Sequence, residues 1–426
     1  MSVDLTQKET EKLHIIQQAS AGLLTNEKAA LMLGISIRQV QRLKKKVQHE
    51  GKAAVIHKLK GKQSNHHIDL VVKEKALTTI KDRYADFKPT FATEKLAEHH
   101  GITISPETTR LWMMKEKLWK SRKQKQTPYR SWRPRKEYFG ELEQFDGSYH
   151  LWFENRYRDS NGNAIEVCLL AAIDDATGKI TKAMFAANEG IVAVSTFWKE
   201  YVEEHGKPVA VYLDKFSTYK INHKVAVDNS ELMTQFQRMM KILLIPLITA
   251  HSAEAKGRIE RLFGTLQDRL VKDMRLAKIN NPREGNNFLN NVFIPDFNKK
   301  FAVVPSKEGN VHKPLQLQEK EQRDHIFSIH DIRRVNLDFT IQFKNNWYQL
   351  TEIQPVTVRS LERVVIETHL DNSVHIILKN HELAYLLLPE KPKKQRIKQP
   401  IILTTHTLNY KPPPNHPWRK YRIKGG

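Results

Sequence analysis

The sequence predicts a multidomain protein with helical units at the N-terminus, a central α/β domain, a small β-barrel and a basic tail. Apolar residues recur at helical spacing over the first 120 residues, and short β-type runs alternate with helical patterns from about residue 138. A chain of 426 residues has room for two to four domains of about 100–200 residues. The predicted segments are a helix-turn-helix unit at 8–50, a basic linker at 51–67, a second helical DNA-binding unit at 68–120, a basic linker at 121–137, the α/β domain at 138–280, a helical or extended connector at 281–325, the β-barrel at 326–389 and a basic, disordered tail at 390–426.

Positive charge is concentrated in three stretches of the chain. Residues 42–62, 115–136 and 391–426 carry net charges of +7, +9 and +10, which together exceed the +23 of the whole chain. Clustered positive charge favours a polyanionic partner, because neutralising phosphates releases counterions. The alternative is that these stretches are only solvated linkers and a solubilising tail. Because the positive charge is concentrated in these stretches, we expect nucleic acid to be the partner.

The composition excludes several classes of protein. The single cysteine, Cys168, excludes an intramolecular disulfide and a cysteine-rich zinc module. No apolar run approaches the roughly 18 residues that span a bilayer, and the first ten residues are polar. We therefore expect a cytoplasmic protein with neither a membrane partner nor a small-molecule substrate.

The first helical unit has the signals of a helix-turn-helix. Thr25 can cap a helix that stops at Gly34, and Ser36 can cap the next helix. Ala30 and Val40 stand where the two helices would touch. The alternative is an ordinary helical hairpin with a basic surface. Polar and basic side chains on the exposed face of the second helix are the predicted DNA contacts: Arg38, Gln39, Arg42 and Lys45.

A second helical unit follows. Residues 93–100 read as a helix ended by Gly101, and Ser105-Pro106 begins another helix that runs through Lys117. Three apolar residues of this helix are spaced to pack inward: Leu111, Met114 and Leu118. The basic linker after it would follow a DNA backbone through Arg130, Arg133 and Arg135.

The paired histidines of the N-terminal half do not predict a metal site. His66-His67 and His99-His100 are adjacent pairs, and two adjacent histidines on a helix do not face one ion.

The central block predicts a mixed sheet in which three sequential strands come first. Asp174 and Asp175 are expected to form the turn between the second and third strands. The predicted strands are 142–145, 165–173, 180–185, 209–213 and 243–248, with helices at 191–205, 231–241 and about 255–276. Beyond residue 326, the runs 341–343 and 347–350 around Asn345-Asn346 predict a hairpin of the small β-barrel.

Three acids of the α/β block are candidates for one site. Asp146 stands at the end of the first strand, Asp214 ends the fourth, and Glu260 lies in the first turns of the long helix. In a sheet of this order the first and fourth strands are neighbours, so both aspartates can converge. The alternative is that strand-end aspartates only cap loops.

Convergence of these carboxylates would require a cation. Repulsion would raise the pKa of at least one of three adjacent carboxyl groups, and divalent cations remove that cost. Mg²⁺ prefers oxygen ligands, and two ions can stabilise the attacking and leaving oxygens of a displacement at phosphorus.

The motifs around these acids resemble those of a known family. They are Phe145 to Ser148, Ala172 to Gly178, Tyr212 to Asp214 and His251 to Arg261. In these segments the chain resembles bacterial insertion-sequence transposases with a retroviral-integrase-type core, and among them the ISNCY group most closely. The resemblance extends from about residue 12 to about residue 314.

The resemblance implies a ribonuclease-H-like fold and a DDE triad of Asp146, Asp214 and Glu260. It implies DNA cleavage at element ends by water, followed by attack of the freed 3′-hydroxyl on target DNA. The cofactor would be Mg²⁺, as two ions that Mn²⁺ can replace. The partners would be double-stranded DNA, both element ends and target, and further copies of the chain, at least a dimer.

Basic residues next to the third acid are further candidates. Lys256, Arg258 and Arg261 are expected to meet phosphates, with plain surface charge as the alternative. Two other functions remain open on the sequence: a domesticated DNA-binding protein with an inactive core, and a structure-specific nuclease.

Overall fold

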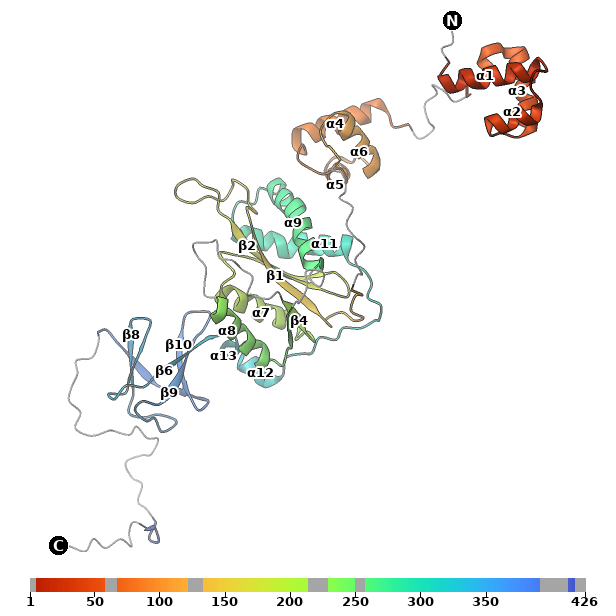
Figure 1. Cartoon of the computed structure of the whole chain (residues 1–426). Coiled ribbons are helices and arrows are strands. Elements are labelled where there is room, and N and C mark those ends of the chain that lie inside the picture. Colours follow the sequence, from red (N-terminus) through yellow and green to blue (C-terminus); the bar gives the residue numbers. More distant parts are fainter. Residues whose placement is uncertain are drawn as a thin grey trace, which may run out of the picture. The chain divides into compact units, whose positions relative to one another are not determined.

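The structure, a computed structural model, describes residues 5–57, 67–121, 133–213, 229–249, 257–390 and 413–417. It divides into two compact units, Met1–Arg122 and Lys123–Gly426, which we describe separately (Figure 1). The predicted disorder of the basic tail falls almost wholly outside the described residues and stays a prediction. None of the helices within the described ranges is long and apolar enough to cross a membrane.

The first helical unit is a three-helix helix-turn-helix, as predicted. Its helices are α1 (Gln7–Ser20), α2 (Asn26–Leu33) and α3 (Ile37–Glu50), followed by a 3₁₀ turn at Gly51–Val55. Thr25 accepts a hydrogen bond from the Lys28 backbone, and Gly34 ends α2 with φ of 64°. Ser36 caps α3 by accepting from the backbone of Gln39. The helices share a small apolar core of Ile16, Ala19, Ala29, Ala30 and Val40.

The second helical unit has the expected caps but a different inner face. It consists of α4 (Leu70–Arg83), α5 (Pro89–His100) and α6 (Pro106–Lys115), with Gly101 left-handed after α5. The prediction that Leu111 and Met114 pack inward is wrong, since they are 52% and 40% exposed. Thr109 and Met113 are buried instead. A hydrogen bond of 2.7 Å from the Thr93 hydroxyl to that of Thr109 satisfies both buried groups.

The central domain contains the predicted mixed five-stranded sheet, in the order β3-β2-β1-β4-β5. Its strands are β1 (Glu143–His150), β2 (Val167–Asp174), β3 (Ile180–Ala186), β4 (Val211–Leu213) and β5 (Leu247–Thr249). The first three strands are antiparallel neighbours, whereas β4 is parallel to both β1 and β5. The predicted start of β5 at residue 243 is too early, because Leu243 and Ile245 close the end of a helix through their backbone N–H groups.

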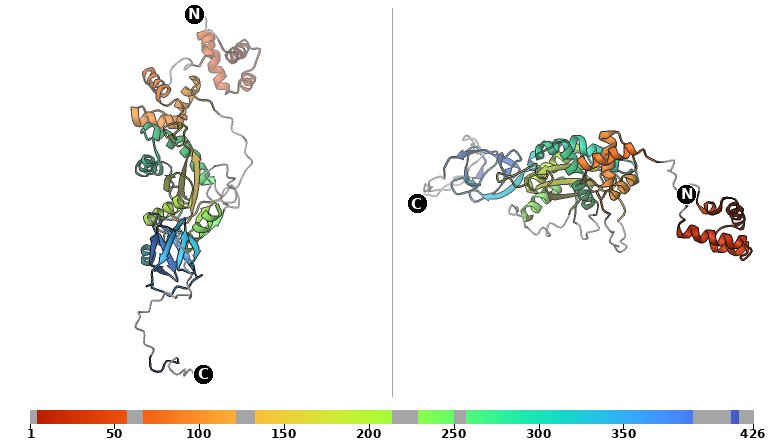
Figure 2. Two further views of the ribbon diagram at one scale, coloured as in Figure 1. Left: turned by 90° about the vertical axis from the view of Figure 1, so that its left-hand side faces the viewer. Right: turned by 90° about the horizontal axis from the view of Figure 1, so that it is seen from above.

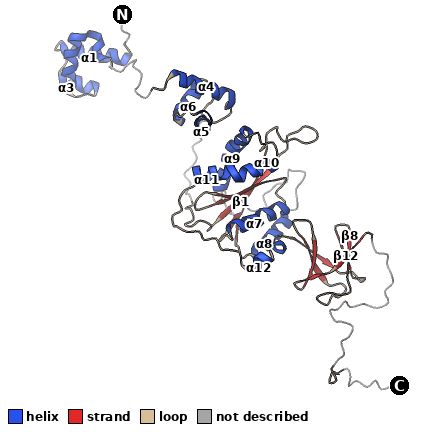
Figure 3. Ribbon diagram, turned by 180° about the vertical axis from the view of Figure 1, so that it is seen from behind, coloured by secondary structure: helices blue, strands red, loops and turns tan. Residues whose placement is uncertain are grey.

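Helices cover both faces of this sheet. On one face α7 (Ile191–His205) and α8 (Asn229–Ile242) pack against Cys168, Leu170 and Ala172 of β2. Alternate residues of β2 point to the other face, where α9 (Gly257–Leu276) packs. Figures 1 and 3 show α7 and α8 on one side of the strands and α9 and α11 (Ile294–Phe301) on the other.

The α/β domain extends beyond its predicted end at residue 280. Helix α10 (Pro282–Phe288), a π-helical turn (Leu289–Phe293) and α11 (Ile294–Phe301) continue the layer begun by α9. Leu289, Phe293 and Phe297 are buried in the same cluster as α9, so this stretch is part of the domain and not a connector. The remaining connector holds only the short helices α12 (Leu317–Glu321) and α13 (Arg323–Ile326).

The C-terminal region is β-rich, as expected. One sheet has the order β11-β10-β9-β6 and the other β12-β8-β7, and both contribute to one apolar core. These strands are drawn in blue in Figure 2. A closed barrel is not confirmed. The strands are β6 (Ile329–Arg334), β7 (Thr340–Phe343), β8 (Asn346–Leu350), β9 (Arg363–Thr368), β10 (Val374–Leu378), β11 (His381–Leu383) and β12 (Tyr385–Leu388).

The predicted hairpin of this region is present, with its turn one residue earlier. Strands β7 and β8 pair as neighbours, and Phe343 faces Asn346. Lys344 and Asn345 have φ of 47° and 64°, which is the backbone of the two-residue turns that match strand twist.

Candidate active site

Asp146 lies within β1 and not at its end as predicted, because the strand continues to His150 through its pairing with β2. Asp146 is on the face of the sheet that α9 covers. Its neighbour Phe145 packs with α7 on the opposite face, and side chains alternate along a strand. Gln144 and Ser148, two positions before and after Asp146, both contact α9. The half-buried Asp146 side chain therefore shares their face.

Glu260 lies in the first turn of α9, and this helix is fixed to β1 at two points around Asp146. The backbone N–H of Ile259 donates to Gln144 Oε1 at 3.3 Å. The Gln267 amide donates to Ser148 Oγ at 3.4 Å. The helix thus runs along the segment of β1 that contains Asp146, and the exposed Glu260 directly follows the first contact.

The third predicted acid, Asp214, lies outside the described residues. The strand before it, β4, ends at Leu213 and pairs in parallel with β1. Glu143 faces Val211, and Gln144 faces Tyr212. The first and fourth strands are therefore neighbours, as the sequence predicts.

Asp175 is the centre of a buried polar cluster next to this region. Its carboxylate is completely buried and accepts from Gln144 Nε2 and Arg258 Nη1, each at 2.7 Å, and from the Lys136 backbone at 2.9 Å. It also accepts from the Arg133 guanidinium. We call Gln144, Asp175, Arg133 and Arg258 the Asp175 cluster. It joins β1, the β2–β3 turn and the start of α9.

The turn-forming role predicted for both aspartates belongs to Asp174. Its carboxylate accepts from the Thr177 backbone at 2.7 Å, from the Thr177 hydroxyl at 2.6 Å and from the Gly140 backbone at 2.9 Å. Burial raises the pKa of Asp174, and these hydrogen bonds oppose the rise. No sequence pattern indicates the role of Asp175, because its side-chain partners are 31 to 83 residues away.

Three of the predicted DNA-contacting arginines surround the β2–β3 turn. Arg133 and Arg258 contact Asp175, and Arg135 donates to the backbone oxygens of Asp175 and Ala176 at 3.3 Å. Burial lowers the pKa of Arg258, while the charge of Asp175 opposes that change. The Arg133 side chain keeps 32% of its surface exposed and that of Arg258 keeps 19%.

The other predicted DNA contacts are exposed or lie outside the described residues. Arg261 is exposed on α9. Lys256 and Arg130 are outside the described ranges. The four predicted contacts of α3 are all exposed on one helix: Arg38, Gln39, Arg42 and Lys45.

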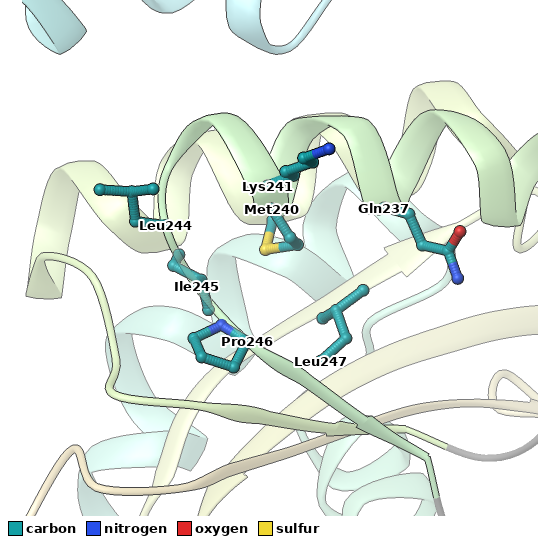
Figure 4. Close-up of a pocket in the computed structure, with 7 residues that line it drawn as sticks. All are labelled: Gln237, Met240, Lys241, Leu244, Ile245, Pro246 and Leu247. Atoms are coloured by element: carbon teal, nitrogen blue, oxygen red, sulfur yellow. The ribbon is translucent and has the colours of Figure 1, made fainter.

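A pocket at the end of α8 does not fit the expected chemistry. Mostly apolar side chains line it, including Met240, Leu244 and Pro246, and Lys241 is its one charged residue (Figure 4). It has no carboxylate to hold a cation, so the acids of β1 and α9 remain the candidate site.

Comparisons with known proteins agree with this architecture. Residues 11–63 match the family model of a helix-turn-helix domain. The chain is 37% identical to "Putative transposase y4bF" of Sinorhizobium fredii (strain NBRC 101917 / NGR234) over 409 residues, covering 96% of this chain and 86% of the relative. It is 28% identical to the transposase for insertion sequence IS1202 of Streptococcus pneumoniae, covering 98% and 94%.

Solved structures with a likeness to this chain include retroviral integrases. The catalytic core domain of HTLV-2 integrase in complex with magnesium matches 36% of this chain and 88% of its own, at 16% identity and a TM-score of 0.27. The simian T-cell lymphotropic virus intasome in complex with the PP2A regulatory subunit B56 gamma matches 70% and 96%, at 12% identity and a TM-score of 0.30.

Proposed function

The chain belongs to the insertion-sequence transposase family, and from that premise we propose that it binds the terminal inverted repeats of its element and catalyses metal-dependent DNA strand cleavage and strand transfer. Asp146, Asp214 and Glu260 form the proposed DDE triad. The substrates are double-stranded DNA of the element ends and of the target, and the active form contains at least two copies of the chain.

The parallel register of β1 and β4 is the observation that carries this proposal. Gln144 faces Tyr212, and each proposed aspartate follows two positions later, Asp146 on β1 and Asp214 after β4. Two positions along a strand return to the same face. Val211 and Leu213 face the α7 side, so the face of Tyr212 is that of α9. This register supports the proposal that the side chains of Asp146 and Asp214 lie close together beneath α9.

The two contacts of α9 with β1 support Glu260 as the third member. They lie on either side of Asp146 along the strand, and Glu260 follows the first of them along the helix. The Asp175 cluster holds this end of α9 through Arg258, while Gln144 reaches both Asp175 and Ile259. Gln144 and Asp175 are therefore positioning residues in the proposal.

Carboxylates are suitable ligands for the proposed cofactor. Asp146 and Glu260 offer hard oxygen donors, which Mg²⁺ and Mn²⁺ prefer. Two such ions would supply positive charge to the attacking and leaving oxygens of the phosphodiester. The side chains of the triad hold that charge in place, and none of them acts as a nucleophile.

Basic side chains would orient the DNA. Arg38, Gln39, Arg42 and Lys45 of α3 are proposed to contact the terminal repeat, as the second helix of a helix-turn-helix does. Arg261 and Lys256 are proposed to meet phosphates near the triad, with Arg130 on the linker before it. A guanidinium has five N–H donors, so Arg133, Arg135 and Arg258 would keep donors for a phosphate beside their present contacts.

Single substitutions in the triad test the proposal. Asp146→Asn, Asp214→Asn and Glu260→Gln are expected to reduce cleavage of labelled element ends by about 10³-fold or more, since charge stabilisation by metal is worth several kcal/mol. Binding of the ends should persist. Asp296→Asn, an exposed acid of α11, removes the same charge outside the site and should cleave normally. Full cleavage in Mg²⁺ by any triad variant would reject the assignment.

The products of the same assay separate the two other functions. A DNA-binding protein with an inactive core would bind ends without cleaving them. A structure-specific nuclease would cleave without joining the freed 3′-end to a second DNA. Joined product is the outcome that this proposal requires.

A further inference from the structure

Histidines surround a buried carboxylate where the connector meets the C-terminal strands. The carboxylate belongs to Glu367 of β9, which is 5% exposed. His325 of α13 and His330 of β6 approach it, as does His369 directly beyond β9. The proposed catalytic function uses none of these groups.

The donor atoms of this cluster lie within reach of one ion. His325 Nδ1 is 2.6 Å from Glu367 Oε2, and His369 Nε2 is 3.4 Å from the same oxygen. One ligand atom from each of the three residues lies within 4.8 Å of the other two. Metal–ligand bonds of about 2.0–2.2 Å at tetrahedral angles separate ligand atoms by roughly 3.3–3.6 Å. His369 Nε2 and Glu367 Oε2 have this spacing, and the 42% exposed side chain of His325 would move outward from its hydrogen-bond distance when an ion binds.

The backbone explains why these side chains converge. Glu367 and His369 are two positions apart at the end of β9, and such residues share one face of a strand. His330 faces Glu367 directly in the pairing of β6 with β9. Helix α13 ends at Ile326, so His325 reaches the cluster from the segment that leads into β6.

We propose that His325, Glu367 and His369 bind one transition-metal ion of the Zn²⁺ class, through His325 Nδ1, Glu367 Oε2 and His369 Nε2. Imidazole nitrogens with one carboxylate are a ligand set that suits Zn²⁺, and a water would fill the fourth position. Mg²⁺ prefers an all-oxygen shell, so this site and the triad would select different ions.

Neighbouring side chains are placed to orient the ligands. His330 Nε2 is 3.3 Å from Glu367 Oε1, the oxygen that the proposed ion does not use. His375 stacks on His369 with ring centroids 4.0 Å apart, and its own Nδ1 is 2.6 Å from Glu382. Such second-layer contacts fix the rotation of ligand side chains.

The ion would join two parts of the second compact unit. Ile326 and Phe327, directly after His325, are buried in the cluster that contains α7 and α8. Glu367 belongs to the sheet of the C-terminal region. A metal held by both segments would fix the C-terminal sheets to the α/β domain.

Zinc affinity of the full chain tests the site. The chain, prepared without a histidine tag and stripped with a chelator, is titrated with Zn²⁺ against a chromophoric chelator in excess Mg²⁺, which occupies oxygen sites. We expect about one tight zinc per chain. The double variant His325→Ala, His369→Ala should bind zinc at least about tenfold more weakly. His381→Ala, an exposed histidine of β11, should bind as the native chain does.

Two measurements on the native chain keep the test independent of how the variants fold. Zinc should raise the melting temperature of the stripped protein, because an ion that binds only the folded state stabilises it. Co²⁺ should give the intense visible absorption of four-coordinate cobalt. If the folded native chain binds zinc no more tightly than the double variant, or Co²⁺ gives no such absorption, the cluster is only a hydrogen-bonded group of histidines around Glu367 and the proposal is rejected.

Discussion

At the residue scale, Asp175 connects the strand of one proposed catalytic acid to the helix of another. Its buried carboxylate faces Arg133 and Arg258, and Gln144 bridges it to the backbone of α9. A buried anion between two guanidiniums is costly to remove, because the remaining positive charges then lack a partner. The geometry of the proposed active site therefore depends on a residue that does not belong to the proposed triad.

Asp175→Asn keeps the shape of the side chain and removes its charge. We expect the free energy of unfolding to fall by about 3–5 kcal/mol, the typical cost of breaking a buried ion pair. Strand cleavage should fall as well, while binding of element ends through α3 persists. Denaturant unfolding and end cleavage measure the two effects. Unchanged stability and unchanged cleavage would show that the Asp175 cluster does not position α9.

The buried carboxyl group of Glu143, also on β1, should make the free energy of unfolding depend on pH. The side chain is completely buried, and its Oε1 has no hydrogen-bond partner among the described residues. Burial raises the pKa of Glu143 well above its ordinary value, and nearby Asp174 adds to the rise. The folded protein therefore binds this proton more tightly than the unfolded chain, and stability is lost as pH rises from the unfolded pKa through the folded one.

Glu143→Gln mimics the protonated side chain and removes this loss. The variant and the native protein should have similar free energies of unfolding near pH 4.5. Above that pH, the free energy of unfolding of the variant should exceed that of the native protein by about 1.4 kcal/mol more for each pH unit, until the folded pKa of Glu143 is reached. Denaturant unfolding between pH 5 and 8 measures the difference. A difference that is constant with pH would mean that Glu143 is not protonated in the folded state.

At the element scale, α3 carries the side chains that we propose to contact the element end. The double variant Arg42→Ala, Lys45→Ala should bind terminal-repeat DNA more weakly. The slope of the logarithm of its binding constant against the logarithm of the salt concentration should be shallower by about 0.9 for each phosphate that the variant no longer neutralises. Lys8→Ala with Lys12→Ala removes the same charge from α1 and is the matched control. Binding titrations over a range of salt concentrations measure both. Equal weakening in the two double variants would mean that only net charge matters.

Two helical glycines give opposite predictions for stability. A Cβ on Gly285 of α10 would lie 2.9 Å from Phe153 Cζ and 3.0 Å from Phe185 Cδ2. A Cβ on Gly264 of α9 would meet nothing within 4 Å. Gly285→Ala should therefore lower the free energy of unfolding by about 1–3 kcal/mol, whereas Gly264→Ala should raise it by about 0.5–1 kcal/mol. Equal effects in thermal unfolding would show that α10 is not packed closely on β3.

The elements were largely predictable because their signals are local. Caps at Thr25 and Ser36 and the stop at Gly34 confirm the predicted helix-turn-helix. The inner face of α6 was not predictable from the spacing of apolar residues. Thr109 is polar, and it can be buried only because its hydroxyl is hydrogen-bonded to that of Thr93 on α5. The extent of the α/β domain was also missed, since the fit of α10 and α11 on β3 depends on contacts distant in sequence.

At the scale of the whole molecule, the chain has a helical N-terminal unit and a second unit that contains the sheet. The sequence could assign Asp146 to the first strand and Glu260 to the long helix, but it placed the end of that strand at Asp146, whereas β1 continues to His150. It could not reveal the Asp175 cluster or the group at Glu367, whose partners come from segments up to 83 and 42 residues away. Such groups exist only after the chain has folded.

The central claim is that carboxylates of β1 and α9 hold the metal that supports strand cleavage. End cleavage by Asp146→Cys, measured in Mg²⁺ and in Mn²⁺, tests it most directly, because a thiolate is a poor ligand for Mg²⁺ and a better one for softer ions. We predict that cleavage is lost in Mg²⁺ and partly restored in Mn²⁺, while Asp146→Ala is inactive in both. Equal activity of Asp146→Cys and the native protein in Mg²⁺ would contradict the claim.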